Sequence, residues 1–233
     1  MLRDILAGLI NIIYPVQCLV CKKLVEQEII VCRDCLSSIK INVPPFCRRC
    51  GRNLKEGNCP YCRNIRLYFD RAFSPCRYVG TSAELIHLLK YKGKIKISGI
   101  LTEILIKFIT GFHIAMDKIA VIVPVPLSSS KLREREFNQS ELISLPIAEK
   151  FKIRHSAGNL IRLSNNKAQV RLKAQSRFKN IQGAFAVKHN DEFYGQNVLL
   201  IDDVLTTGAT CSEAARILKE SGAKSVSVLT FAS

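Results

Sequence analysis

The hydrophobic residues of this chain fall into short continuous runs that alternate with longer stretches at helical spacing. Continuous apolar runs at 119–123 and 198–201 predict buried strands, and the segment at 225–231, after Gly222, is expected to be the last strand. The stretches at 81–92 and 97–113 carry apolar residues three and four positions apart, which predicts helices with one apolar face. Strands separated by helices are typical of an α/β fold with a parallel sheet.

Local signals predict where several of these elements begin and end. Thr81 or Ser82 is expected to cap the first helix, and Gly93 is expected to stop it. Two prolines, Pro124 and Pro126, end the first strand sharply, because proline has no N–H to donate to a sheet. The serine-rich stretch at 127–138 that follows is expected to be a loop.

Two aspartates and a threonine-rich turn follow the second apolar run. Adjacent carboxylates, here Asp202 and Asp203, are costly at the end of a buried strand unless a ligand or cation compensates them. The turn at 206–210 leads into a helix, for which Thr210 and Glu213 are expected to form a capping box. Exposed amides and the helix dipole make such a turn a phosphate cradle, and carboxylates suit vicinal sugar hydroxyls. We therefore expect a ribose 5-phosphate site here, and no lysine follows the glycine as a P-loop requires.

Eight of the ten cysteines precede residue 63 and form four Cys-x-x-Cys pairs. Each pair can hold one side of a tetrahedral Zn²⁺ ion, so two pairs close a structural site with no open position for catalysis. Consecutive pairing is favoured, while pairing of the first knuckle with the third also fits the spacing. A disulfide framework is disfavoured because no secretion signal precedes the pairs. We expect two structural zinc ions, held by Cys18, Cys21, Cys32, Cys35, Cys47, Cys50, Cys59 and Cys62.

Length and composition fit a protein of two parts. The chain has 233 residues, and a hydrophobic content of 48% is ample for a core. We expect an N-terminal helix and a double zinc ribbon over 1–69, followed by an α/β domain over 70–233. The apolar stretch within 1–14 is too short to span a bilayer, so no transmembrane segment is expected. A packed amphipathic helix is the preferred interpretation, and an anchor on a membrane surface is the alternative.

The net charge of +16 is unevenly distributed along the chain. The stretch at 150–190 contains no acid. A small diphosphate does not require so many cations, so either a polyanion or a solvated basic face accounts for the excess. The ribbons add Arg48, Arg49, Arg52 and Lys55. The ten bases of the acid-free stretch are Lys150, Lys152, Arg154, Arg162, Lys167, Arg171, Lys173, Arg177, Lys179 and Lys188.

The run at 198–210 resembles the diphosphosugar-binding signature of type I phosphoribosyltransferases. This resemblance implies that Asp202 and Asp203 hold the ribose hydroxyls of phosphoribosyl diphosphate, bound together with Mg²⁺. It also implies a diphosphate-binding loop at 127–138 and a hood over the substrate at 161–180. In purine-salvage members an aspartate stands at the position of Thr206, so purine salvage is disfavoured. The 5-phosphate is expected to lie against Thr206, Thr207, Gly208, Ala209 and Thr210.

Nearly the whole chain resembles the ComF family of natural competence. The family is cytoplasmic and is implicated in handling single-stranded DNA after uptake, so we expect the same location and partner here, with competence DNA-processing proteins as further partners. The chain departs from the family pattern at Glu136, where glycine is usual, at Asn166, where threonine is usual, and at Ala168, where proline is usual. The resemblance is carried by Lys90-Tyr91, Pro124-Val125-Pro126, Arg133-Glu134-Arg135, Phe137-Asn138-Gln139, Arg162, Gln169, Leu172, Arg177, Asn180 and Gly183-Ala184-Phe185.

Two functions follow from these expectations. The first is a DNA-handling competence protein whose α/β domain binds phosphoribosyl diphosphate or a related sugar phosphate as a ligand. The second is an active phosphoribosyltransferase, of unknown acceptor and not of the purine-salvage type. No catalytic residue is assigned, and the choice between a catalytic and a regulatory site stays open. The expected diphosphate contacts are Lys90, Arg133, Arg135 and Arg177.

Overall fold

A five-stranded parallel sheet lies at the centre of this computed structural model, which describes residues 15–54, 59–63, 65–163, 178 and 180–233. The strand order is β1-β7-β6-β2-β3, and every neighbouring pair is parallel. This is the α/β fold with a parallel sheet that the sequence predicts. The strands are β1 at Arg71–Phe73, β2 at Val121–Pro124, β3 at Arg154–His155, β6 at Asn197–Val204 and β7 at Ser225–Ala232.

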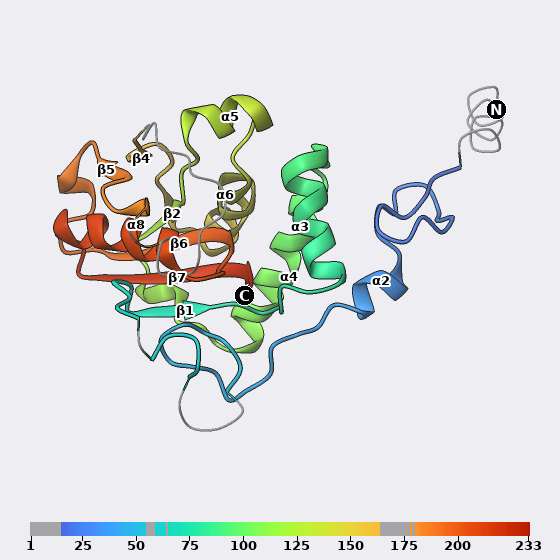
Figure 1. Ribbon diagram of the computed structural model, residues 1–233, viewed down its shortest axis with the longest axis horizontal. Helices are drawn as coiled ribbons and strands as arrows, with labels where there is room; N and C mark the ends of the chain where they lie inside the picture. The colour runs from blue at the N-terminus through green and yellow to red at the C-terminus, as the bar shows by residue number, and fades with distance from the viewer. Residues whose placement is uncertain (1–14, 55–58, 64, 164–177, 179) are drawn as a thin grey trace.

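Helices cover both faces of this sheet (Figure 1). The helices α3 (Thr81–Lys92), α4 (Ile97–Gly111) and α6 (Gln139–Phe151) pack against one face, and α8 (Ala209–Glu220) packs against the other. In α4 the buried residues Leu101, Leu105, Phe108 and Ile109 recur at helical spacing, as its sequence predicts. Short 3-10 helices lie at Met116–Lys118 and Asn190–Glu192.

The strand β6 is buried on both faces. Val198 and Leu200 point into the core on the α8 side, while Leu199 and Ile201 point into the core under α3, α4 and α6. None of the four is more than 2% exposed, and burial of one such side chain contributes about 1.5–3 kcal/mol. We expected the strand to end at residue 201, but it continues to Val204 because β7 pairs with it that far. The two aspartates therefore lie within the strand, where both of its faces are covered.

Two predicted helix caps are wrong. Gly80, not Thr81 or Ser82, precedes α3, and the Ser82 hydroxyl donates instead to carbonyls of the preceding turn. Gly208 precedes α8 with a φ of 81°, so Thr210 is already inside the helix and no capping box forms. In both cases a glycine with positive φ makes the turn into the helix without a side-chain cap. The predicted stop of α3 at Gly93, in the left-handed conformation, is confirmed.

The stretch at 127–138 is a helix in part, where we expected a loop. Residues Ser129–Arg135 form α5, whose first turn is capped by the Ser128 hydroxyl, which accepts from the Lys131 amide at 3.5 Å. A serine before the helix and long side chains within it are sufficient for this short element. The helix ends at Glu136, which adopts the left-handed conformation with a φ of 67°. That conformation is the physical reason why glycine suits this position.

The N-terminal ribbons lie outside the central layers. One runs through the short helix α2 (Arg33–Ser37) at the right of Figure 1, and the other lies below β1. Each contains one antiparallel bridge, Gln17 with Leu24 and Phe46 with Asn53. The second ribbon packs so closely on β1 that a Cβ added to Gly51 would lie 2.4 Å from the Ala72 carbonyl oxygen. The predicted boundary between residues 69 and 70 stays a prediction.

A small antiparallel sheet accompanies the main one. It consists of β4 (Leu160–Arg162) and β5 (Phe185–Val187), which flank most of the stretch predicted to be a hood. The N-terminal helix expected within 1–14 lies outside the described residues, as do residues 164–177 and 179 of the hood. Among the helices that are described, none combines the length and apolarity that crossing a membrane requires.

Replacement of Glu136 by glycine should stabilise the protein, because a side chain at positive φ costs roughly 1–2 kcal/mol that glycine avoids. Glu136→Gly should raise the melting temperature by about 2–8 °C, while Glu136→Ala, which removes the same charge but keeps a Cβ, should not. Thermal unfolding followed by circular dichroism measures both. An equal gain from both variants would show that the charge, not the backbone conformation, sets the effect.

Candidate functional site

The eight paired cysteines form two clusters of four sulfur atoms. Consecutive pairs come together, and within each cluster all sulfur atoms lie within 4.8 Å of one another. Four of these Sγ–Sγ distances are 3.8, 3.6, 3.6 and 3.5 Å. Four thiolates around zinc at about 2.3 Å have edges of about 3.8 Å, so both clusters fit a tetrahedral zinc ion. The pairing of the first knuckle with the third is thereby excluded, and the clusters are Cys18, Cys21, Cys32 and Cys35, and Cys47, Cys50, Cys59 and Cys62.

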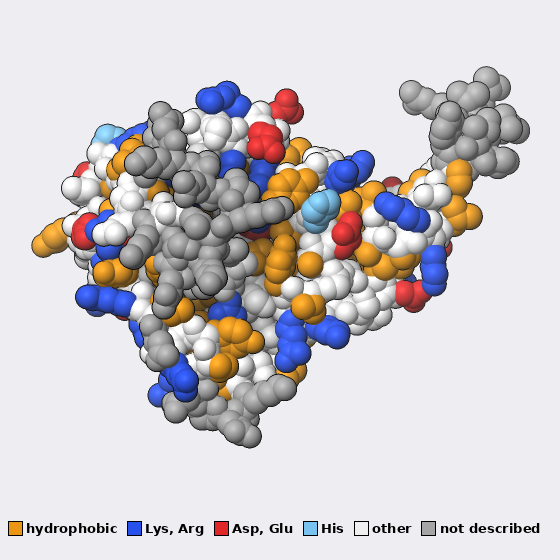
Figure 2. Space-filling model, in the orientation of Figure 1, with side chains coloured by type: hydrophobic (Ala, Val, Ile, Leu, Met, Phe, Trp, Pro, Cys, Tyr) orange, Lys and Arg blue, Asp and Glu red, His pale blue; other side chains and the backbone are white. Residues whose placement is uncertain are grey.

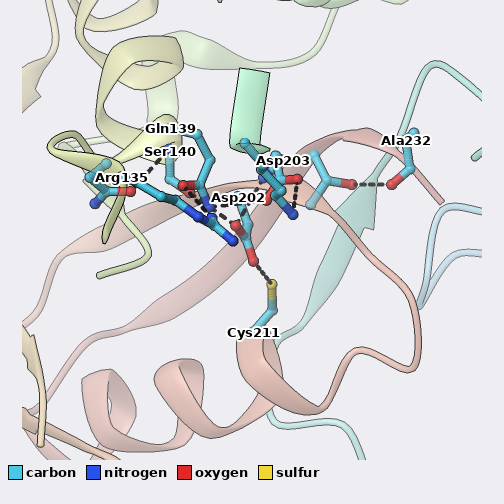
Figure 3. A network of polar contacts seen from close by, with 10 residues as sticks. Arg135, Gln139, Ser140, Asp202, Asp203, Cys211 and Ala232 are labelled. Carbon is cyan, nitrogen blue, oxygen red and sulfur yellow. Dashed lines mark hydrogen bonds and ion pairs between the residues drawn. The ribbon is translucent and has the colours of Figure 1, made fainter. Parts of the chain in front are cut away.

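The two aspartates of β6 are buried, and each is held by a neighbouring element (Figure 3). The Ser140 hydroxyl at the start of α6 donates to Asp202 Oδ1 at 2.9 Å, and the Asp203 amide donates to the same oxygen at 2.9 Å. Asp203 forms an ion pair with Lys90 of α3. It also accepts a longer hydrogen bond, at 3.4 Å, from the side-chain Nε2 of Gln139. The fold thus brings residues from α3 and α6 onto the acid pair of β6.

The acid pair affects the pKa of its members and of their partner. Burial, followed by the charge of Asp203, raises the pKa of Asp202 to about 7. Burial disfavours the charge of Lys90, but the charges of Asp203 and Asp202 outweigh it and raise the pKa of this lysine. Two buried carboxylates beside a single lysine leave negative charge to be neutralised, and Asp202 responds by holding its proton near neutral pH.

Further cations converge on the same place. Arg135 Nη1 donates to Oε1 of the Gln139 side chain at 3.1 Å, and its guanidinium lies 5.1 Å from the centre of the Tyr91 ring. Arg135 Nε is buried and has no hydrogen-bond partner in the part of the chain that the structure describes. Partial burial and the charges of Arg162, Arg135 and Lys90 lower the pKa of Lys131. Electrostatic repulsion between these neighbouring cations costs free energy, and a bound anion would remove that cost.

The turn between β6 and α8 offers free amides beside these cations. Within the described residues, the N–H groups of Thr206, Thr207 and Gly208 donate to no protein acceptor. Gly208 has a positive φ that favours glycine, and a Cβ there would make a tight contact of 3.3 Å with Leu67 Cδ2. Free amides at the start of a twelve-residue helix bind anions such as phosphate.

The structure places the predicted site residues as follows. Lys90 and Arg135 lie at the acid pair, whereas the Arg133 side chain is exposed and makes no hydrogen bond or ion pair with a described residue. Arg177 lies outside the described residues. Sequence reasoning missed Gln139 and Ser140 as site residues, although both follow the basic stretch at the start of a helix. Lys131 and Arg162 belong to the stretches expected to bind diphosphate and to form the hood, but they were not named among the expected diphosphate contacts.

One of the basic ribbon residues is turned inward. Arg52 donates through Nη2 to the carbonyl oxygens of Leu205 and Thr206, and it stacks on Tyr61. Arg48 is exposed, as expected for a residue that contacts a polyanion. Lys55 lies outside the described residues. Of the basic residues of the second ribbon, Arg48 therefore lies on the surface, whereas Arg52 contacts the turn between β6 and α8.

Two family models match the chain. The double zinc ribbon domain matches residues 9–66, and the phosphoribosyl transferase domain matches residues 154–233. Their order agrees with the observed structure, in which two four-cysteine ribbons precede a parallel-sheet domain. The fold class predicted from the sequence is confirmed: a double zinc ribbon followed by a domain of the type I phosphoribosyltransferase class.

Three relatives are similar over most of their length. Competence protein ComFC of Bacillus subtilis is 30% identical, with 94% of this chain and 95% of that protein covered. DNA utilization protein YhgH of Salmonella typhimurium is 29% identical over 91% of this chain and 87% of its own. Competence protein F of Haemophilus influenzae is 26% identical, with coverage of 85% and 88%.

The raised pKa of Asp202 predicts a pH-dependent gain in stability from Asp202→Asn. A carboxyl whose pKa rises from an ordinary value near 4 to about 7 on folding stabilises the protein at low pH, and this stability is lost as pH rises to 7. Asparagine stays neutral, so the variant should gain roughly 2–4 kcal/mol over wild type between about pH 5 and pH 8. Urea unfolding at both pH values measures the gain, and exposed Asp117→Asn is the control. A gain that does not change with pH would contradict the assignment.

Proposed function

The chain belongs to the ComF family of competence and DNA utilization proteins, and on this premise we propose that it handles single-stranded DNA after uptake. Its α/β domain binds phosphoribosyl diphosphate together with Mg²⁺, or a related sugar phosphate, at the acid pair and the turn that follows. A location in the reducing cytoplasm suits this chain, because its eight paired cysteines must stay reduced to act as zinc ligands. Competence DNA-processing proteins are the partners that this role implies.

One observation carries the ligand proposal: Lys90 pairs directly with the buried acids, and three further cations lie within electrostatic reach of Lys90 or Asp202, next to a turn with free amides. Lys90, Lys131, Arg135 and Arg162 influence one another's charge state or that of the acids. An ordinary structural ion pair needs one cation for each acid, so the excess points to an anionic ligand. A sugar with phosphates at both ends matches the three kinds of group, since hydroxyls suit the carboxylates and phosphates suit the cations and amides.

Each group has a defined task in this proposal. Asp202 and Asp203 accept hydrogen bonds from the ribose hydroxyls, and the ion pair with Lys90 holds the Asp203 side chain in place. The free Nε of Arg135 and the ammonium of Lys131 bind the diphosphate. Mg²⁺, when bound, neutralises part of the diphosphate charge. The amides of Thr206, Thr207 and Gly208 bind the 5-phosphate.

A second function, transfer of the phosphoribosyl group to an acceptor, is favoured by the position of these cations. Donors fixed in advance around a departing diphosphate stabilise the charge that develops on it, which is how such sites accelerate transfer. Thr206 cannot supply the carboxylate that assists purine bases in salvage enzymes. Release of diphosphate that depends on an added acceptor distinguishes transfer from binding alone.

The proposed DNA contacts rest on surface charge. Lys and Arg side chains lie in several places on the face shown in Figure 2, including the ribbon at its lower edge. In the acid-free stretch at 150–190, the described lysines Lys150, Lys152 and Lys188 are all exposed. Exposed cations without paired acids bind nucleic-acid phosphates by releasing counterions, without sequence preference.

Removal of the negative charge of Asp203 should weaken binding of phosphoribosyl diphosphate. Asp203→Asn removes a charge-assisted acceptor, and we expect a loss of roughly 1–3 kcal/mol in the presence of Mg²⁺. Isothermal titration calorimetry measures the loss, and Asp191→Asn, the same change at an exposed residue, should leave the affinity unchanged. Equal affinities for wild type and the double variant Asp202→Asn, Asp203→Asn would place the ligand elsewhere.

Single-stranded DNA should bind with a strong dependence on salt. Each phosphate contact is expected to contribute about 0.7 to the slope of log affinity against log salt. Glutamine substitutions at Arg171, Lys173, Arg177 and Lys179, which lie outside the described residues, should lower both affinity and slope. Fluorescence anisotropy at several salt concentrations measures both quantities.

The matched control for this experiment removes the same charge from exposed lysines elsewhere. Lys92, Lys94, Lys96 and Lys118 lie around α3 and α4 and before β2. Their glutamine variant should lose less affinity. If single-stranded DNA fails to bind at roughly 50 mM salt, or binds without salt dependence, the DNA-handling role is wrong and the transferase function gains support.

A further inference from the structure

The second zinc ribbon contacts the turn that the proposed function assigns to phosphate. Arg52 Nη2 donates to two successive carbonyl oxygens, those of Leu205 and Thr206, although more than 150 residues separate them in sequence. The guanidinium also lies over the Tyr61 ring, 4.6 Å from its centre, and this stacking helps to orient it. A planar guanidinium can bridge two adjacent acceptors in a fixed geometry, and the shorter reach and point charge of lysine cannot do so equally well.

The cysteine cluster holds both Arg52 and Tyr61 in place. The Cys47 amide donates to the Arg52 carbonyl oxygen at 2.7 Å, so Arg52 closes the turn of the first knuckle of this ribbon. Tyr61 lies in the second knuckle, between Cys59 and Cys62. All four cysteines share one buried cluster with Leu205. The side chain that reaches the turn therefore starts from a backbone whose shape the metal-binding cluster sets.

The direction of the two carbonyls determines the direction of the amides. In a trans peptide the C=O and N–H bonds point to opposite sides. With the carbonyls of Leu205 and Thr206 directed at Arg52, the amides of Thr206 and Thr207 point away from the ribbon. These are the amides without an acceptor in the described part of the chain. Arg52 thus supports the turn from the side opposite to a bound phosphate.

Additional contacts connect the end of the ribbon to the start of α8. The Tyr68 amide donates to the Ser212 hydroxyl at 3.0 Å. Leu67 and Phe69 lie against Gly208, at 3.3 and 3.8 Å from the place where its Cβ would be. The segment after Cys62, the last cysteine of the ribbon, therefore contacts the start of α8, while Arg52 binds the two carbonyls of the turn.

We propose that Arg52 is a positioning residue of the phosphate-binding turn, and that the second zinc ribbon is a part of the sugar-phosphate site. This inference rests on the proposed binding of phosphoribosyl diphosphate. Arg52 does not touch the ligand; it sets the direction of the amides that do. An arginine used in this way is also unavailable to DNA, although it belongs to the basic ribbon.

The test compares Arg52→Ala with Arg48→Ala, an arginine of the same ribbon that is exposed. Calorimetry with phosphoribosyl diphosphate and Mg²⁺ should show at least about tenfold weaker binding for Arg52→Ala and no change for Arg48→Ala. Arg52→Lys should lie between Arg52→Ala and wild type. Free guanidinium added at millimolar concentration should restore part of the affinity of Arg52→Ala, which a residue of purely structural importance would not show.

A second measurement reads the turn without any ligand. Order parameters from ¹⁵N relaxation should be near 0.85 for the Thr206 and Thr207 amides of wild type and of Arg48→Ala, and below about 0.6 for Arg52→Ala. Zinc analysis should give two ions per chain for every variant. Loss of zinc from Arg52→Ala would make Arg52 a folding residue of the ribbon and would overturn the inference.

The two proposals fail in different ways. If wild type does not bind phosphoribosyl diphosphate, the proposed function is wrong, while the order parameters still decide whether Arg52 positions the turn. If wild type binds and Arg52→Ala binds equally well with an equally rigid turn, the ligand proposal stands and the role of Arg52 is overturned.

Discussion

Burial of two adjacent carboxylates at the end of β6 is the constraint on which the rest of the site depends. An uncompensated carboxylate in a protein interior costs several kcal/mol, so the neighbouring elements must supply partners. Helix α3 supplies Lys90, and α6 supplies Gln139 and Ser140 from its first turn. These contacts tie the end of α3 and the start of α6 to β6. Burial and the charge of Asp203 still raise the pKa of Asp202 to about 7, so the acid pair is only partly compensated.

The need to support the acid pair also explains why the short motifs that resemble the ComF family occur in this chain. Asn138 caps α6, since its side chain accepts from the Ser140 amide at 3.1 Å, and it ties the helix to the Val125 carbonyl at 3.2 Å. Gln139 then connects Arg135 to Asp203. Motifs that are distant in sequence thus contact the two carboxylates, either directly or through one intermediate residue. Glu136 departs from the usual glycine at a position where the backbone is left-handed.

Much of this architecture was predictable from the sequence because it depends on local pattern. Buried strands read as continuous apolar runs, and the spacing of the cysteines indicated two four-cysteine sites. The caps of α3 and α8 were not predictable in this way, because a glycine with positive φ replaced the expected side-chain cap. Helix α5 was missed because a stretch of seven residues carries too little periodicity to identify. The contact of Arg52 with Leu205 depends on how the two parts pack, which no local pattern encodes.

The distribution of the cations suggests how one basic protein can serve two anionic ligands. Lys90, Arg135 and Arg52 are held by carboxylate, amide or carbonyl oxygens, so their charges have fixed positions and directions. Exposed lysines such as Lys150 and Lys188 are free to exchange one phosphate for another, as binding along a strand requires. Under the proposed function, the first group would serve a small ligand that needs exact placement, and the second would serve a polymer that needs only charge. The bases behind the net charge of +16 therefore include both fixed and exposed side chains.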